Sequence, residues 1–197
     1  MSERSPRAFE RVGDETVYEG RIVEVHIERF RHADGLEEDR EVVRSRGAVA
    51  VVAHDAKRVW LVRQPREAVG ETDLLEIPAG RLDVEGEEPL QAAQRELAEE
   101  IGLGGKGWEP ILEYYSSAGF TDERVYLFAA TDLYEESKDS GENERIEIVG
   151  WPLSQLDRAI EQCEDAKTLI GLMWLARKLN GSLHRQGGPA GEAKPKG

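Results

Sequence analysis

The chain has 197 residues, of which 39% are hydrophobic and 34% charged, and its formal net charge is −14. A chain this acidic, without a basic stripe, is not expected to bind nucleic acid, because the phosphate backbone is recognised by basic patches. The single cysteine, Cys163, cannot form an internal disulfide, and no apolar run has the length of a signal peptide or a membrane span. We therefore expect a cytoplasmic protein that contacts no membrane.

The N-terminal part of the chain predicts a small β segment. Residues 1–14 are polar and are expected to form a loose arm, whereas residues 16–31 alternate like a strand with one slip. Asp34-Gly35 is a turn signal, and residues 38–45 are expected to return as a second strand. Since a two-stranded hairpin is marginally stable alone, residues 1–45 should pack on the main domain or on a partner chain.

The rest of the chain interleaves apolar strand patterns with helical ones. Strands are predicted at residues 48–52, 59–62, 74–79, 108–116, 124–130 and 145–151, with a loop at 64–70. Helices are predicted at residues 154–162 and 166–179, after the one described next. The second of these has a broad apolar face formed by Leu169, Leu172, Met173, Leu175 and Ala176. This order favours an α/β sandwich with a mixed sheet over residues 46–180, followed by a disordered tail at 181–197.

A glycine loop and a helix between Gly80 and Leu103 organise the chain. Pro89 suits the first helical turn, where a missing N–H costs nothing, and Gly102 suits the residue just past the helix end. The apolar residues recur at spacings of three and four and form one stripe, which consists of Leu90, Ala93, Leu97 and Ile101. We expect this stripe to face the core.

Three carboxylates flank that stripe near the end of the helix. Glu96 and Glu100 are one turn apart, and Glu99 lies further round the helix. Like charges at this spacing repel by roughly 0.2–0.5 kcal/mol, and Arg95, four residues before Glu99, offsets only part of the repulsion. The alternative interpretation is a solvated acidic face. Because clustered hard oxygens suit Mg²⁺ or Mn²⁺, the helix is also a candidate metal site.

The spacing resembles the Nudix box, the signature of hydrolases that cleave nucleoside diphosphates linked to another moiety. Glu87, seven further residues and then Arg95 to Leu103 match the pattern at every fixed position. The departure is at the front, where six residues instead of five separate Gly80 from Glu87. The resemblance implies a Nudix-type α/β/α sandwich with a mixed sheet, plus the small N-terminal β appendage.

Outside the box the chain is similar to ADP-ribose pyrophosphatases. The similarity covers about residues 16–180 and is carried by four features, which are residues 44–51, residues 61–66 followed by 74–80, residues 116–123 and residues 141–144. Ala118 departs from the Ser-Pro-Gly that the subfamily usually has, which leaves the substrate open within the class. The resemblance implies Mg²⁺-dependent hydrolysis of ADP-ribose to AMP and ribose 5-phosphate.

The resemblance also implies which residues hold the metal and perform the chemistry. The metal ligands would be the carbonyl of Ala79 and the carboxylates of Glu96, Glu99, Glu100 and Glu144. Glu142, in a polar loop at residues 135–144, would be the general base, with Glu99 as the competing candidate and Arg95 as a further catalytic residue. The alternative for this loop is a solvated acidic turn.

Substrate contacts are implied for Arg46, Arg66, Arg63 and Gly119. Arginine suits bidentate contact with phosphate, and the alternative for Arg46 and Arg66, and more so for Arg63, is an ordinary surface residue. An aromatic side chain of the N-terminal segment, Tyr18 or Phe30, is a candidate for stacking on adenine.

Other functions remain open at this point. Within the class, the substrate could be another nucleotide sugar, NADH or a dinucleoside polyphosphate. A nucleotide-binding Nudix regulator without activity is a rival, but the intact carboxylates Glu96, Glu99 and Glu100 favour an enzyme. An RNA-processing relative is disfavoured by the net charge. In the family, the N-terminal segment is exchanged between subunits, so we expect a homodimer through residues 16–45.

Overall fold

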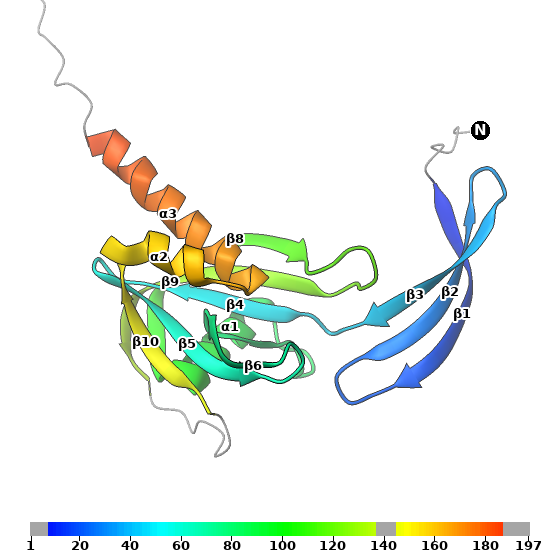
Figure 1. Cartoon of the computed structure of the whole chain (residues 1–197), viewed down its shortest axis with the longest axis horizontal. Helices are drawn as coiled ribbons and strands as arrows, with labels where there is room; N and C mark the ends of the chain where they lie inside the picture. The colour runs from blue at the N-terminus through cyan, green and yellow to red at the C-terminus, as the bar shows by residue number, and fades with distance from the viewer. Residues whose placement is uncertain (1–7, 137–144, 187–197) are drawn as a thin grey trace, which may run out of the picture.

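The structure is a computed structural model, and it describes residues 8–136 and 145–186. It contains three sheets with strand orders β1-β2-β3, β10-β5-β6 and β7-β4-β9-β8. The first sheet projects to one side of the body that contains the other two (Figure 1). No helix among the described residues is long and apolar enough to cross a membrane.

The N-terminal sheet has three antiparallel strands, β1 (Phe9–Glu19), β2 (Glu24–His32) and β3 (Glu37–Arg44). The predicted slip is in fact a turn that separates two strands, closed by a hydrogen bond from the Gly20 N–H to the Val23 carbonyl at 2.9 Å. The prediction of a two-stranded hairpin was therefore wrong. The predicted loose arm was also wrong over residues 9–14, because they form the first half of β1.

Two sheets form the body. One contains β4 (Ala48–Ala53), β7 (Ala79–Arg81), β8 (Leu103–Tyr115) and β9 (Arg124–Glu135), in which β4 and β9 are parallel. The other contains β5 (Arg58–Arg66), β6 (Glu71–Glu76) and β10 (Glu147–Pro152), all antiparallel. The predicted loop at residues 64–70 is wrong at its start, since β5 continues through Arg66 and pairs it with Glu71.

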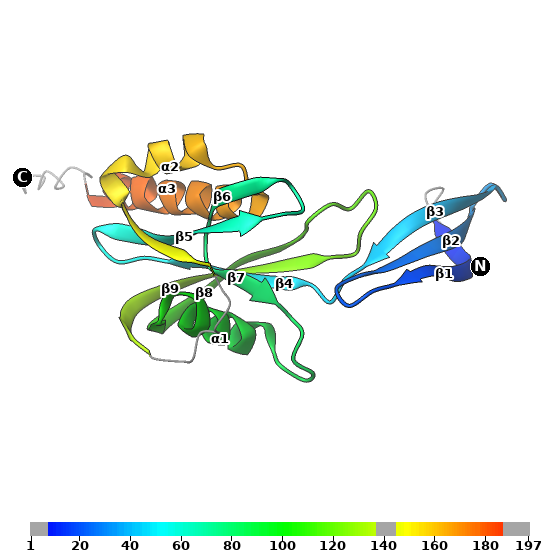
Figure 2. The same cartoon turned by 60° about the horizontal axis from the view of Figure 1, so that its bottom comes forward.

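Helices cover both sides of these sheets. The α-helices are α1 (Pro89–Ile101), α2 (Leu156–Gln162) and α3 (Ala166–Gln186), with a 3₁₀ turn at Leu153–Gln155. In Figure 2, α1 lies on one side of the sheets and α2 and α3 lie on the other. The predicted α/β sandwich with a mixed sheet is confirmed. The predicted tail was wrong over residues 181–186, which belong to α3, and residues 187–197 lie outside the described part.

The central strand β4 is buried on both faces. Val49, Val51 and Ala53 pack in the cluster that contains α1, whereas Ala50 and Val52 pack in the cluster that contains α2 and α3. A strand covered on both faces is expected to be continuously apolar, as this one is. Two residues placed in apolar stripes from the sequence are instead exposed, namely Leu90 at 39% and Met173 at 56%. Leu90 lies in the first turn of α1, and Met173 lies on the same side of α3 as exposed Arg177 and Asn180.

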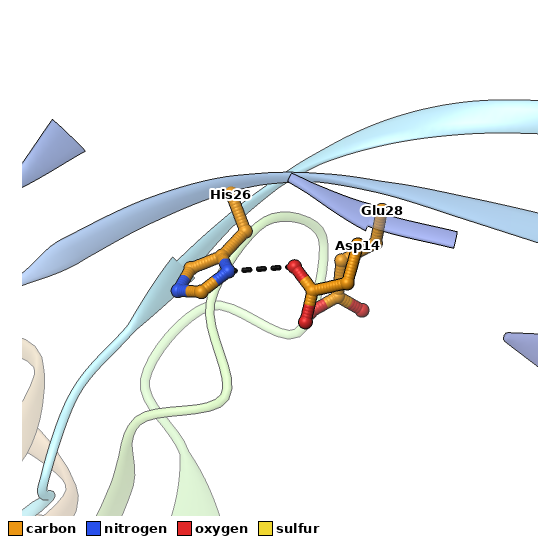
Figure 3. A group of neighbouring side chains, drawn as sticks. All are labelled: Asp14, His26 and Glu28. Atoms are coloured by element: carbon orange, nitrogen blue, oxygen red, sulfur yellow. Dashed lines mark hydrogen bonds and ion pairs between the residues drawn. The ribbon is translucent and has the colours of Figure 1, made fainter. Parts of the chain in front are cut away.

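A network of charged side chains holds the three N-terminal strands together. Asp14, His26 and Glu28 offer ligand atoms within 4.8 Å of one another, and His26 Nδ1 lies 2.7 Å from Asp14 Oδ1 (Figure 3). However, Glu28, only 1% exposed, accepts hydrogen bonds from Arg11 and Arg44. Ion pairs thus account for the cluster, and we assign no metal to it.

This network predicts a dependence of stability on pH. The hydrogen bond with Asp14, followed by that with Glu24, raises the pKa of His26 above 6.5. Protonated His26 therefore contributes its full stability below about pH 6.5, and the contribution is lost as the pH rises through the higher folded pKa. We expect the Tm of the wild type to fall more steeply than that of His26→Gln between about pH 6 and pH 9. Equal slopes in thermal melts of the two proteins would contradict the prediction.

Candidate active site

A cleft of about 680 Å³ lies between α1, the end of β5, β7, β8 and the start of α3. Six described acidic side chains line it, namely Asp83, Glu96, Glu99, Glu100, Glu123 and Asp165. Four described positive side chains also line it, namely Arg66, Arg81, Arg95 and Lys167. Such a wall suits a ligand that brings both divalent cations and phosphate groups.

Helix α1 begins and ends where the sequence indicates. Pro89 is its first residue, and the backbone N–H of Glu88 donates to Gln91 Oε1 at 3.1 Å. At the other end, Gly102 has the left-handed φ of 67° and its N–H donates to the Ala98 carbonyl at 3.1 Å. Buried Leu97 fixes the face that packs on the core, so the carboxylates next to it line the cleft.

Two of those carboxylates lie against the Ala79–Gly80 segment of β7. Glu100 Oε2 accepts a hydrogen bond from the Ala79 N–H at 2.9 Å. Glu96 approaches Gly80 so closely that a Cβ built there would lie 1.9 Å from the carboxylate carbon of Glu96. A glycine is therefore required at position 80 to leave room for the Glu96 carboxylate.

This contact predicts the effect of a single added methyl group. In Gly80→Ala, the Glu96 carboxylate must move away, and because it ends a flexible side chain the fold should survive. We expect Gly80→Ala to keep its Tm within a few degrees and to need a higher divalent-metal concentration for half-maximal activity. Gly181→Ala is the control for an added methyl group alone, because Gly181, like Gly80, has no positive φ and no atom lies within 4 Å of its Cβ position. An unchanged metal requirement in Gly80→Ala would contradict the predicted role of Glu96.

Arg95 partly neutralises the negative charge of the carboxylates around it. Its Nε and Nη2 donate to Glu87 at 3.0 and 2.9 Å, and its Nη1 donates to Glu96 at 2.6 Å and to Glu99 at 3.0 Å. The hydrogen bond with Glu87 is the largest of the effects that raise the pKa of Arg95. Burial raises the pKa of Glu96, and Arg95 opposes that shift.

The donor set fits a divalent metal. Glu96, Glu99, Glu100 and the backbone of Ala79 supply only oxygen ligands, which Mg²⁺ and Mn²⁺ prefer. Glu96 and Glu99 already share one cationic partner, Arg95, so their carboxylates are close enough to face a common positive charge.

Comparison with known proteins decides the family. The model of the NUDIX domain matches residues 44–170. The chain belongs to the NUDIX family.

Several known proteins match most of the chain. The ADP-ribose pyrophosphatase of Bacillus subtilis (strain 168) is 36% identical over 172 residues, which are 85% of this chain and 92% of the relative. The ADP-ribose pyrophosphatase of Mycobacterium tuberculosis is 37% identical over 77% of this chain and 74% of the relative. The methanol dehydrogenase activator of Bacillus methanolicus is 32% identical over 82% and 89%. The crystal structure of an ADP compounds hydrolase matches with a TM-score of 0.80 at 25% identity, over 91% of this chain and 98% of that chain.

The cleft of about 680 Å³ described above contains some of the predicted site residues. The structure brings together Ala79, Arg95 and the three box carboxylates with Arg66, whose Nε donates to Glu76 Oε2 at 2.7 Å. Glu142 and Glu144 lie outside the described residues. Their roles as general base and metal ligand therefore stay predictions.

Three other predicted substrate residues do not line the NUDIX cleft. Arg46 donates to the Asp83 carbonyl at 3.2 Å, and Arg63 pairs with exposed Asp73 at 3.0 Å. Gly119 lines a different pocket of about 480 Å³, between its own loop and the N-terminal sheet. Their roles as substrate contacts therefore stay predictions.

Sequence reasoning missed Asp165 and Lys167, which enter the NUDIX cleft from the start of α3. Asp165 Oδ2 accepts hydrogen bonds from the backbone N–H of Thr168 at 2.9 Å and from its hydroxyl at 2.6 Å, as an N-cap does. The Thr168 hydroxyl lies 2.8 Å from the backbone N of Ile77, the donor, and so attaches α3 to the segment after β6. An acidic cap ahead of an amphipathic helix was the sequence signal that could have located them.

Proposed function

We propose that the protein is a divalent-metal-dependent NUDIX hydrolase that cleaves the diphosphate of ADP-ribose into AMP and ribose 5-phosphate. The observation that carries the proposal is the contact of Glu100 with the Ala79 N–H and of Glu96 with Gly80, in a cleft that Arg66 also lines. The names of relatives from Bacillus subtilis and Mycobacterium tuberculosis support the substrate.

The residues that line the cleft have different roles in this reaction. Glu96, Glu99, Glu100 and the Ala79 backbone would hold Mg²⁺ or Mn²⁺, which supplies neutralisation of the diphosphate charge and acidification of water when bound. Arg95 orients Glu96 and Glu99 and, through Glu87, is itself held in place. Arg66 supplies a fixed guanidinium for a phosphate group. The proton of the attacking water goes to Glu142 or to Glu99.

A substrate panel tests the proposal. The purified protein is assayed with ADP-ribose, a nucleotide sugar, NADH and a dinucleoside polyphosphate, with and without Mg²⁺. We expect the highest kcat/KM for ADP-ribose, with AMP and ribose 5-phosphate as products, and no turnover after chelation. A higher kcat/KM for another compound would replace the proposed substrate, and turnover in the presence of chelator would contradict the metal requirement.

A second candidate is hydrolysis of a different nucleoside diphosphate derivative. Ala118, at the position where the subfamily usually has proline, favours this alternative. The GDP-mannose pyrophosphatase of Cronobacter sakazakii is 33% identical over 72% of this chain and 83% of that protein. GDP-mannose is therefore the nucleotide sugar to include in the panel.

We also propose a cytoplasmic homodimer in which residues 1–45 form the dimerisation and substrate-contact segment and residues 46–180 form the hydrolase domain. The N-terminal sheet exposes large apolar side chains, with Phe9 at 65%, Tyr18 at 58% and Ile22 at 59% exposure. A second copy that covers them could also bring Gly119 of one chain to the substrate of the other. Sedimentation at micromolar concentration is expected to give a dimer, and a fully active monomer would contradict the proposal.

A further inference from the structure

A buried carboxylate behind the cleft holds two positive side chains from different elements. Glu76, the last residue of β6, is 2% exposed. It accepts a hydrogen bond from Arg66 Nε of β5 at 2.7 Å and another from Lys167 Nζ at the start of α3. Arg66 and Lys167 both line the cleft that contains the three box carboxylates, whereas Glu76 lies behind them. One anion therefore fixes two cations at the wall of the site.

The other positive charges of the cleft are committed elsewhere. Arg95 is engaged by Glu87, Glu96 and Glu99, and Arg81 lies 3.5 Å from Asp83. Lys167 also donates to Asp165 at 2.8 Å, and these contacts account for two of the three N–H donors of its ammonium group. The third N–H of Lys167 can donate a hydrogen bond to a phosphate oxygen in the cleft.

Stability alone is a weak reason for this arrangement. Burying a carboxylate with its counter-ions costs desolvation that the attraction only partly offsets, and apolar side chains of similar volume often stabilise a core as well. The ammonium group of Lys167 is also held by both Glu76 and Asp165. The side chain therefore has little conformational entropy left to lose when an anion binds. Both features are those of a preorganised binding group.

We propose that Lys167 binds a non-bridging oxygen of the substrate diphosphate and that Glu76 is a positioning residue, which holds Lys167 and Arg66 toward that group. The proposal rests on the proposed function only in taking a diphosphate as the ligand. Lys167 then contacts the substrate from the wall of the cleft formed by β5 and α3.

The competing explanation is that Lys167 only neutralises Glu76. In that case, replacing Lys167 lowers stability and leaves the kinetics of the folded protein unchanged. The two explanations are separated by measuring kcat, KM and Tm of Lys167→Met and Lys167→Arg at saturating Mg²⁺. Lys178→Met is the matched control, since it removes a positive charge from the same helix at an exposed ion pair with Glu109.

We expect Lys167→Met to raise KM by roughly 10–100-fold, the usual effect of losing a hydrogen bond to a charged group, with a smaller change in kcat. Lys167→Arg should recover part of the loss, and Lys178→Met should resemble the wild type. A KM for Lys167→Met within twofold of the wild type, with only the Tm lowered, would overturn the proposal.

The positioning role of Glu76 has its own test. Glu76→Gln keeps the volume of the side chain but removes the charge that holds both cations, so KM should rise at least as much as in Lys167→Met. Because the two residues act as a unit, the double variant should lose little more than Glu76→Gln alone. Losses that multiply in the double variant would show independent roles and reject the positioning of Lys167 by Glu76.

These outcomes are distinguishable from failure of the proposed function. All variants are assayed on ADP-ribose and on GDP-mannose beside the wild type. If the wild type cleaves only GDP-mannose, ADP-ribose is the wrong substrate, and the effect of Lys167→Met is still measured on GDP-mannose. If the wild type cleaves ADP-ribose and Lys167→Met does so with unchanged KM, the proposed function stands and the role of Lys167 is rejected.

Discussion

Replacing Glu100 by glutamine is expected to reduce turnover by several orders of magnitude while the protein remains folded. The glutamine side chain keeps an oxygen that can accept the Ala79 N–H, so the contact between α1 and β7 survives. What is lost is the negative charge that a divalent cation requires from its ligand. The measurement is kcat at saturating Mg²⁺ together with a thermal melt.

The matched control for Glu100→Gln is Glu161→Gln, which removes one negative charge from an exposed position on α2. It should leave both turnover and Tm as in the wild type. Wild-type turnover in Glu100→Gln would refute the assignment of this carboxylate to the metal. A large fall in Tm together with the loss of activity would instead assign Glu100 a mainly structural role.

Replacing Glu142 by glutamine should slow the chemical step by roughly 10²–10⁴-fold, which is the usual span for loss of a general base. Glu142 lies outside the described residues, so this prediction is based on the resemblance to ADP-ribose pyrophosphatases. Substrate affinity should change little. The rate of the chemical step is read from single-turnover reactions with enzyme in excess.

Glu99→Gln is the comparison that separates a base from a metal ligand. Glu99 lines the cleft and is held by Arg95 Nη1 at 3.0 Å, so it is the competing base. Higher Mg²⁺ should partly restore a variant that has lost a ligand and should not restore one that has lost the base. If Glu142→Gln reacts like the wild type and Glu99→Gln is inactive at every Mg²⁺ concentration, the base is on α1 and the assignment to Glu142 is wrong.

Much of the site could be predicted because its geometry is local. Pro89 and Gly102 set the ends of α1, and the spacing of Glu96, Glu99 and Glu100 places them beside the buried face of one helix. The position of Gly80 against Glu96 follows from the packing of that helix on the strand before it. Features of α1 that depend only on neighbouring residues could therefore be predicted from the sequence.

Features that depend on distant packing could not be predicted. Lys167 and Glu76 are far apart in sequence, and their ion pair exists only because α3 packs beside β6. The hydrogen bond from Arg46 to the Asp83 carbonyl likewise joins residues that are distant in sequence. Periodicity placed Leu90 and Met173 in apolar faces, but both are exposed, because only the neighbouring elements decide how far along and how far round a helix is covered.

The parallel pairing of β4 with β9 has a consequence for the synthesis of the chain. Apart from a bridge between Val43 and Thr121, the described strands of the N-terminal sheet pair with their sequence neighbours, whereas the partner of Ala48 is Val125. At roughly 5–20 residues per second, a ribosome needs several seconds to reach β9 after β4 has emerged. During that interval the apolar strand Ala48–Ala53 lacks its parallel partner, and an unpaired apolar strand is prone to intermolecular pairing. The nascent chain should therefore depend on chaperones most strongly between completion of β4 and completion of β9.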